Sequence, residues 1–134
     1  MAGAIYNTLT TCTLNGNDIM GQLNLIELGR TRNVIRWVNF SDTAYNQDTD
    51  LSQETVHFVG VYTATANQAF DVASDCYEAS GAGTAGTLSF KPAATGYVFG
   101  AVGKFTDAPV RFGVGAVATM EFTMAVNGTI SRTG

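Results

Sequence analysis

VATMEFTMAV, residues 117–126, alternates apolar and polar side chains more cleanly than the rest of the chain. Successive side chains of a strand point to opposite faces of its sheet. One face of this stretch would carry Ala118, Met120, Phe122, Met124 and Val126, and the other Thr119, Glu121 and Thr123. The pattern predicts a half-buried strand, with one face on a core and the other in water.

Residues 54–62 alternate as well, but both of their faces are partly apolar. Val56, Phe58 and Tyr62 would lie opposite Val59 and Val61, which predicts a strand that is central or covered by a neighbour. The Asn-Gly pairs at 15–16 and 127–128 are tight-turn signals. The other strand candidates are residues 10–14, 23–28, 34–40, 84–90 and 97–105.

Residues 65–79 break the strand pattern and predict one short helix packed on the sheets. Their apolar positions form a helical stripe, which we interpret as core: Ala66, Ala69, Phe70, Ala73, Cys76 and Tyr77. Thr65 and Gln68 resemble a capping box, and Gly81 lies where the helix would stop.

Two segments read as loops within a single domain spanning residues 1–134. Residues 41–52, SDTAYNQDTDLS, are polar and join two strand candidates, and structureless loops of this length are usually functional. Our hypothesis is that this loop stays disordered until it docks. Residues 79–86, ASGAGTAG, predict a flexible connector.

The composition points away from nucleic-acid binding. Hydrophobic residues make up 46% of the 134 residues and charged residues 13%, with a net charge of −4. So few charges indicate a surface covered by hydroxyls, amides and glycine, or one hidden in an assembly. A protein that grips phosphates would need a basic stripe, whereas the seven basic residues here are scattered. The exception is Arg30, Arg32 and Arg36, which either form a small contact or lie on an ordinary solvated edge.

Cys12 and Cys76 lie far apart and belong to no metal-binding or redox motif. We favour two buried thiols, with one disulfide as the alternative. The N-terminus lacks the basic start and long apolar run of a signal peptide, and no stretch approaches a membrane span. We therefore expect a protein made in the cytoplasm, with no membrane partner.

The chain offers no convergent set of catalytic groups, so we expect neither an enzyme nor a cofactor or metal site. His57 and Glu54 are three residues apart and would point to opposite faces of a strand. No nucleophile elbow or phosphate-binding glycine pattern is present. Asp48 and Asp50 superficially resemble a calcium loop, but the required glycine and final glutamate are missing.

The middle of the chain, RTRNVIRWVNFSDTAYNQDTDLSQETVHFVGVYTA (residues 30–64), resembles a segment of bacteriophage tail tube, or major tail, proteins. In that family a strand ends in a Phe-Gly-Asp-Thr-like turn, a polar loop follows, and the next strand ends in an aromatic residue after glycine. The matching residues are Phe40-Ser41-Asp42-Thr43, Leu51, Phe58 and Gly60-Val61-Tyr62, with Ser41 departing from the glycine.

Both ends of the chain extend the resemblance in the right order. TCTLNGNDIMGQLNLIEL (residues 11–28) is similar to the family's opening, with its Asn-Gly turn and Asp18. VATMEFTMAVNGTISRTG (residues 117–134) resembles the closing strand and the Gly-x-Ile-x-Arg ending at Gly128, Ile130 and Arg132.

The resemblance implies a mainly β fold, a β-sandwich or barrel-like tail-tube fold with one short flanking helix. It implies a siphophage-like structural protein of the virion tail. Copies would form rings, generally hexameric, that stack into a tube through which DNA passes without specific binding, beside other tail proteins. The inter-ring loop would map onto Phe40, Ser41, Asp42, Thr43, Tyr45, Asp48, Asp50 and Leu51.

Two assignments keep alternatives. Thr119, Glu121 and Thr123 either line the lumen or face outward, and Phe40 and Tyr45 either anchor a subunit contact or cap the chain's own core. Alternative functions are a head decoration or other minor structural protein, a secretion-system tube, or a carbohydrate-binding module that stacks sugars on Trp37 or on an exposed residue of the five tyrosines. A hydrolase would be expected to depend on His57.

Overall fold

The computed structural model describes residue 3 and residues 9–134. Its elements are, in chain order, β1 (Thr11–Leu14), β2 (Asn17–Asp18), a short 3-10 turn (Met20–Gln22), β3 (Leu23–Trp37), β4 (Asn46–Val61), α1 (Ala69–Glu78), β5 (Gly86–Lys91), β6 (Val98–Asp107), β7 (Val110–Arg111), β8 (Thr119–Val126) and β9 (Ser131–Thr133).

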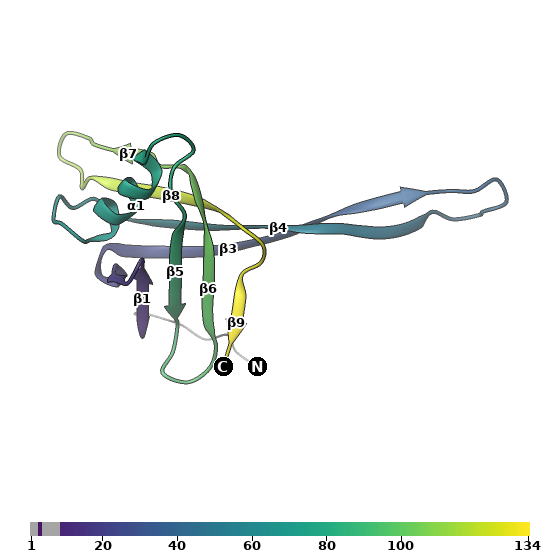
Figure 1. Ribbon diagram of the computed structural model, residues 1–134, viewed down its shortest axis with the longest axis horizontal. Coiled ribbons are helices and arrows are strands. Elements are labelled where there is room, and N and C mark those ends of the chain that lie inside the picture. The colour runs from purple at the N-terminus through teal and green to yellow at the C-terminus, as the bar shows by residue number, and fades with distance from the viewer. Residues whose placement is uncertain (1–2, 4–8) are drawn as a thin grey trace.

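All strands belong to one antiparallel sheet with the order β2-β1-β5-β6-β8-β4-β3, while β7 pairs with β8 and β9 with β6. The sheet changes direction where β6 passes from β5 to β8, so that β5 and β6 run across β3, β4 and β8 (Figure 1). β6 changes partner at Gly103, which pairs with both Gly86 and Val126, and a register shift between Phe105 and Asp107 follows in the β6–β8 pair. The predicted mainly β fold with one short helix is confirmed, but the sheet is open and does not close into a barrel.

The core lies where the two parts of the sheet cross. Phe58 of β4 packs on Phe105 and Phe122, with ring centroids 5.9 and 5.5 Å apart. Met120, Phe122 and Met124 are fully buried, whereas Thr119, Glu121 and Thr123 are partly exposed, so the prediction for β8 is confirmed. β4 is central, because it pairs with β3 on one side and β8 on the other.

Gly60 allows β3 to start close to β4. A Cβ at this position would overlap the carbonyl oxygen of Gln22, immediately before β3. The register of the β3–β4 pair shifts between Leu23 and Leu25, beside this crossing. Only glycine allows so close an approach of two backbones.

The helix begins later than the sequence pattern predicts. Gln68 is its N-cap but makes no side-chain capping bond, so the capping box is wrong. The Gln68 side chain instead accepts a hydrogen bond from Thr63 Oγ1 at 2.6 Å. Asn67, directly before the N-cap, adopts a left-handed φ of 63°, and its N–H donates to Asp71.

α1 packs on β6 and β1 through Ala69, Val72, Ala73 and Cys76. Two stripe members differ from the prediction: Ala66 precedes the helix, and Tyr77 is 47% exposed because it lies beside the buried stripe. Residues 79–85 connect α1 to β5, with positive φ at Gly81 and Gly83.

Cys12 and Cys76 are both buried free thiols, so the favoured assignment is confirmed. Burial, with a smaller contribution from the charge of Asp18, raises the pKa of Cys12 to about 12. Asn15 Nδ2 donates to Cys76 Sγ at 3.3 Å.

The predicted loop of residues 41–52 is wrong in its second half. Asn46–Ser52 belong to β4, and the two separate strands expected at 23–28 and 34–40 are one strand, β3. The two strands satisfy each other's backbone groups along this length, although the segment is too polar for a core strand. Only residues 38–45 remain a loop, and disorder before docking stays a prediction for them.

Candidate assembly interface

The most unusual feature of the molecule is a long two-stranded extension, residues 30–54, which we call the arm. β3 and β4 project far beyond the rest of the sheet, and the hairpin ends in the loop 38–45 (Figure 1). The pairing of β4 with β8 begins at Thr55, so the β4 part of the arm pairs with β3 alone. An isolated two-stranded hairpin is marginally stable in water, and the arm therefore needs other contacts to hold its shape.

The register of the arm is regular except at one point. Arg30 pairs with Glu54 and Arg32 with Ser52, but Val34 pairs with Thr49. Between the last two pairs β4 contains one more residue than β3, which is the definition of a bulge. The extra residue lies in β4, so the local twist increases while the alternation of β3 continues through the bulge.

Alternation along β3 gives the arm two different faces. Arg30, Arg32, Val34 and Arg36 continue the face that carries Leu28 over the core, and we call this the basic face. The opposite face carries Ile35 and Trp37, with Asp48 paired to Ile35 on β4. We call this second surface the apolar face.

Large apolar side chains of the arm are in contact with water. Phe40 is fully exposed, Leu51 is 85% exposed and Tyr45 67%, and Val34, Ile35, Trp37 and Val38 are about half exposed. Soluble monomers rarely expose so many large apolar groups in one extension, and such patches mark interaction sites. The alternative that Phe40 and Tyr45 cap the chain's own core is wrong, because neither touches it.

The tip has its own polar bracing. One oxygen of Asp42 accepts hydrogen bonds from the Asn39 N–H at 2.7 Å and from Asn46 Nδ2 at 2.8 Å. The Asp42 N–H returns a bond to the Asn39 carbonyl at 3.0 Å. The carboxylate thus joins the two ends of the loop that presents Phe40 and Tyr45.

The structure separates the predicted inter-ring residues into two groups. Phe40, Ser41, Asp42, Thr43 and Tyr45 lie together in the loop at the tip, and all of them except Ser41 line a shallow hollow. Asp48, Asp50 and Leu51 lie on β4, with the last two at the bulge. Both groups belong to the arm, and none approaches the core.

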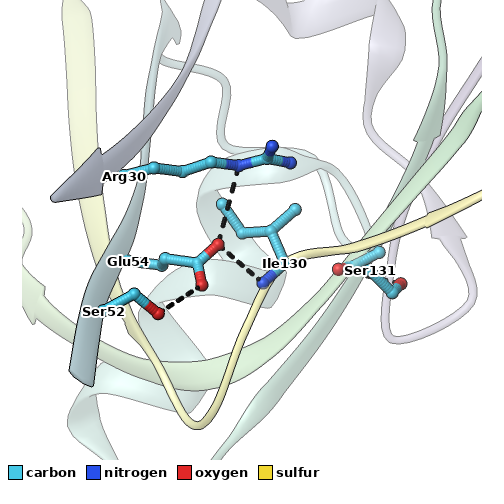
Figure 2. A network of polar contacts seen from close by, with 6 residues as sticks. Arg30, Ser52, Glu54, Ile130 and Ser131 are labelled. Carbon is cyan, nitrogen blue, oxygen red and sulfur yellow. Dashed lines mark hydrogen bonds and ion pairs between the residues drawn. The ribbon is translucent and has the colours of Figure 1, made fainter. Parts of the chain in front are cut away.

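The base of the arm is held by a carboxylate that sequence reasoning did not select (Figure 2). Glu54 is buried, and its Oε1 accepts the N–H of Ile130 at 3.0 Å and lies 3.6 Å from Arg30 Nε. Its Oε2 accepts a hydrogen bond from Ser52 Oγ at 3.1 Å. The network ties the segment before β9 to the point where β4 leaves the core. The sequence does contain a signal for this role: Glu54 lies on the same face of the strand as the apolar residues Val56 and Phe58.

The three predicted lumen residues lie on one face of β8, beside β4. His57 Nδ1 lies 3.0 Å from Thr123 Oγ1, and its Nε2 lies 3.7 Å from Glu121 Oε1. Arg111 of β7 donates to Glu121, and this hydrogen bond is the main cause that lowers the pKa of Glu121 below its usual value. Glu54 and His57 lie on opposite faces of β4, as predicted, and form no dyad.

Potential metal ligands are dispersed over the part of the chain that is described. There, His, Cys, Asp and Glu side chains form no group of three able to hold a metal ion. In the same residues, no helix is long and apolar enough to cross a membrane. The arm presents exposed apolar side chains that are available for contact with another molecule.

Comparisons with known proteins find similarity in fold but not in sequence. No family model and no curated protein sequence matches the chain. A solved chain from the tail of an empty gene transfer agent particle, refined with C6 symmetry, is similar with a TM-score of 0.64. It is 12% identical, over 84% of this chain and 83% of that one. A chain of the sheath/tube terminator of an extracellular contractile injection system, in its extended state, gives a TM-score of 0.65.

This chain has the fold of those tail and injection-system proteins. The injection-system match is 12% identical and covers 99% of this chain and 100% of the other, so arm and body are included. The fold implied by the tail-tube resemblance of residues 11–28, 30–64 and 117–134 is therefore the fold observed.

Proposed function

We propose that the protein is a non-enzymatic structural subunit of a phage-like tail, and that its copies assemble into stacked, hexameric rings that form the tail tube. The observation that carries this proposal is the arm. It is a paired hairpin that exposes Phe40, Tyr45 and Leu51, has no core of its own, and projects from a body with the fold of tail proteins. Assembly would bury these side chains against a neighbouring copy.

Open sheet edges support ring formation. The sheet ends in β3 on one side and in the two-residue β2 on the other, and neither end is paired within the described chain. Unpaired edges of this kind are templates for pairing with another chain. In the proposed ring, neighbouring copies join their sheets and close a barrel that one chain leaves open.

The partly exposed face of β8 suits the wall of a conduit. Thr119, Glu121 and Thr123 offer hydroxyls and a carboxylate, and Glu121 stays ionised because Arg111 donates to it. With a net charge of −4, the subunit would repel DNA phosphates more than it holds them. DNA would then pass without specific binding, and the protein would reside in the virion tail beside other tail proteins.

A second candidate is a terminator or tube subunit of an injection machine. The nearly complete coverage of both chains in the injection-system comparison favours it. A tube subunit should stack into many rings, whereas a terminator should stop at one ring. A head decoration protein should form neither tubes nor rings, and a carbohydrate-binding module should also form neither and should bind immobilised glycans instead.

Negative-stain electron microscopy over a concentration series tests the proposal. We expect hollow tubes or stacked rings from the wild-type protein, and their loss in a Phe40→Ser, Leu51→Ser double variant. Val114→Ser is the matched control, because Val114 is fully exposed but lies between β7 and β8, away from the arm. Single rings would favour the terminator, and uniform small particles at every concentration would contradict assembly by this chain alone.

A further inference from the structure

We propose that the basic face of the arm docks on an acidic hollow beside α1 of the next copy, so that opposite charges at the two ends of the molecule select a head-to-tail contact. This inference rests on the proposed function and names the surface that receives the arm. Three observations support it: the exposed arginines of the arm, the acidic residues around α1, and the location of the arm tip and α1 at opposite ends of the molecule.

The positive charges of the arginines on the basic face are not fully neutralised by contacts within the described residues. Arg36 Nε donates to the neutral side chain of Gln47 at 3.2 Å, and Arg30 lies 3.6 Å from Glu54, which is already bonded to Ile130. Arg32 forms no ion pair within residue 3 and residues 9–134, and it lines two hollows at the base of the arm. All three side chains are exposed, and Val34 lies among them.

The opposite end of the molecule has the complementary charge. α1 carries Asp71, Asp75 and Glu78 and no basic residue. Asp71 and Asp75 line a hollow of about 290 Å³ together with Asn15, Asn17, Asn67 and Thr84, all of which can accept hydrogen bonds. Guanidinium groups carry five donors in a fixed fork and match carboxylates well, so Asp71 and Asp75 are suitable partners for an arginine of the basic face.

The positions of the two surfaces decide what the contact can build. Figure 1 shows α1 at one end of the longest axis and the tip of the arm at the other. The arm of one chain therefore cannot reach its own α1. A contact between different surfaces of two copies is heterologous, and it builds either a closed ring or an open stack of copies. Arm-to-helix docking is the arrangement expected between stacked rings.

Charge also selects which face of the arm docks. The apolar face carries Asp48 beside Ile35 and Trp37, and an acidic hollow would repel it. Exposed ion pairs add little affinity, and they act mainly on orientation and association rate. The contact should consequently weaken as salt screens the charges.

Charge reversal provides the test. An arm variant, Arg32→Glu with Arg36→Glu, and a helix variant, Asp75→Lys with Glu78→Lys, each replace attraction by repulsion between like charges. Each should therefore raise the critical concentration for assembly roughly tenfold or more. Mixing the two should restore assembly, because each arm then meets an opposite charge on the other variant. Lys91→Glu with Lys104→Glu is the control, since it makes the same charge change outside the arm and should assemble as wild type does.

Sedimentation velocity of the same samples separates the two hypotheses. Association in the mixture and not in either variant alone supports the docking contact even below the threshold for tubes. An arm variant that assembles like wild type, with the same salt dependence, overturns this inference and leaves the proposed tube intact. Wild-type protein that stays dispersed contradicts the proposed function. If the mixture of the two variants also fails to associate, the docking contact is overturned as well.

Discussion

β4 runs through two regions that differ in almost everything except secondary structure. In the body, Val56 and Phe58 are fully buried and belong to the core. A few residues earlier, in the arm, Leu51 is 85% exposed on the same strand. The body is stabilised by the packing of its core, whereas the arm is held mainly by backbone hydrogen bonds between β3 and β4. A strand can therefore be specified by its partner strand alone, but its side chains then remain available to another molecule.

The largest expected contrast is between core and arm substitutions. Phe58→Ala should lower the free energy of unfolding by about 3–5 kcal/mol, because it removes a ring packed between Phe105 and Phe122. Leu51→Ala should change it by less than about 0.5 kcal/mol in the dispersed protein. Urea denaturation measures both, and an equal cost at the two sites would break the comparison.

The boundary between the regions gives an intermediate effect. Glu54→Ala should cost about 1–3 kcal/mol, because it leaves the Ile130 N–H buried without an acceptor. Glu54→Gln keeps an oxygen for that N–H and loses the ion pair, so it should cost less. Gln53→Ala is the control, since Gln53 is exposed on the other face. Equal stability of Glu54→Ala and the control would show that the network does not anchor the arm.

How much the sequence predicts differs between the same two regions. The alternation in residues 117–126 correctly indicates the buried Met120, Phe122 and Met124, because burial imposes a period of two. In residues 46–52 nothing is buried, so the pattern is absent and the aspartates favour a loop prediction. Their strand is imposed by pairing with β3, which a local pattern does not encode.

The candidate site follows the same rule. The resemblance of residues 30–64 selects the residues of the arm that are exposed, although it describes them as a loop. Glu54 could not be assigned a role, because its partner Ile130 lies 76 residues away in the chain. The contact of Arg111 with Glu121 was missed because it depends on β7, a two-residue strand without a pattern of its own.

The smallest expected effect concerns charge on the body. The lowered pKa of Glu121 means that its ionised form is favoured in the folded state, chiefly by Arg111. The associated stability is present at neutral pH and is lost as the pH falls below the usual value of 4.5 and through the lowered pKa. Arg111→Gln should return the pKa toward 4.5, as measured by NMR titration of the Glu121 side chain. An unchanged pKa would show that Arg111 does not stabilise the ionised form of Glu121.

Hydrogen exchange of dispersed and assembled protein, followed by mass spectrometry, tests the central claim most directly. If the arm is the assembly interface, peptides from residues 30–54 should exchange rapidly in dispersed protein and become protected on assembly. Peptides covering β8 should be protected in both states and serve as the internal reference. An arm that exchanges equally fast in both states would contradict the account.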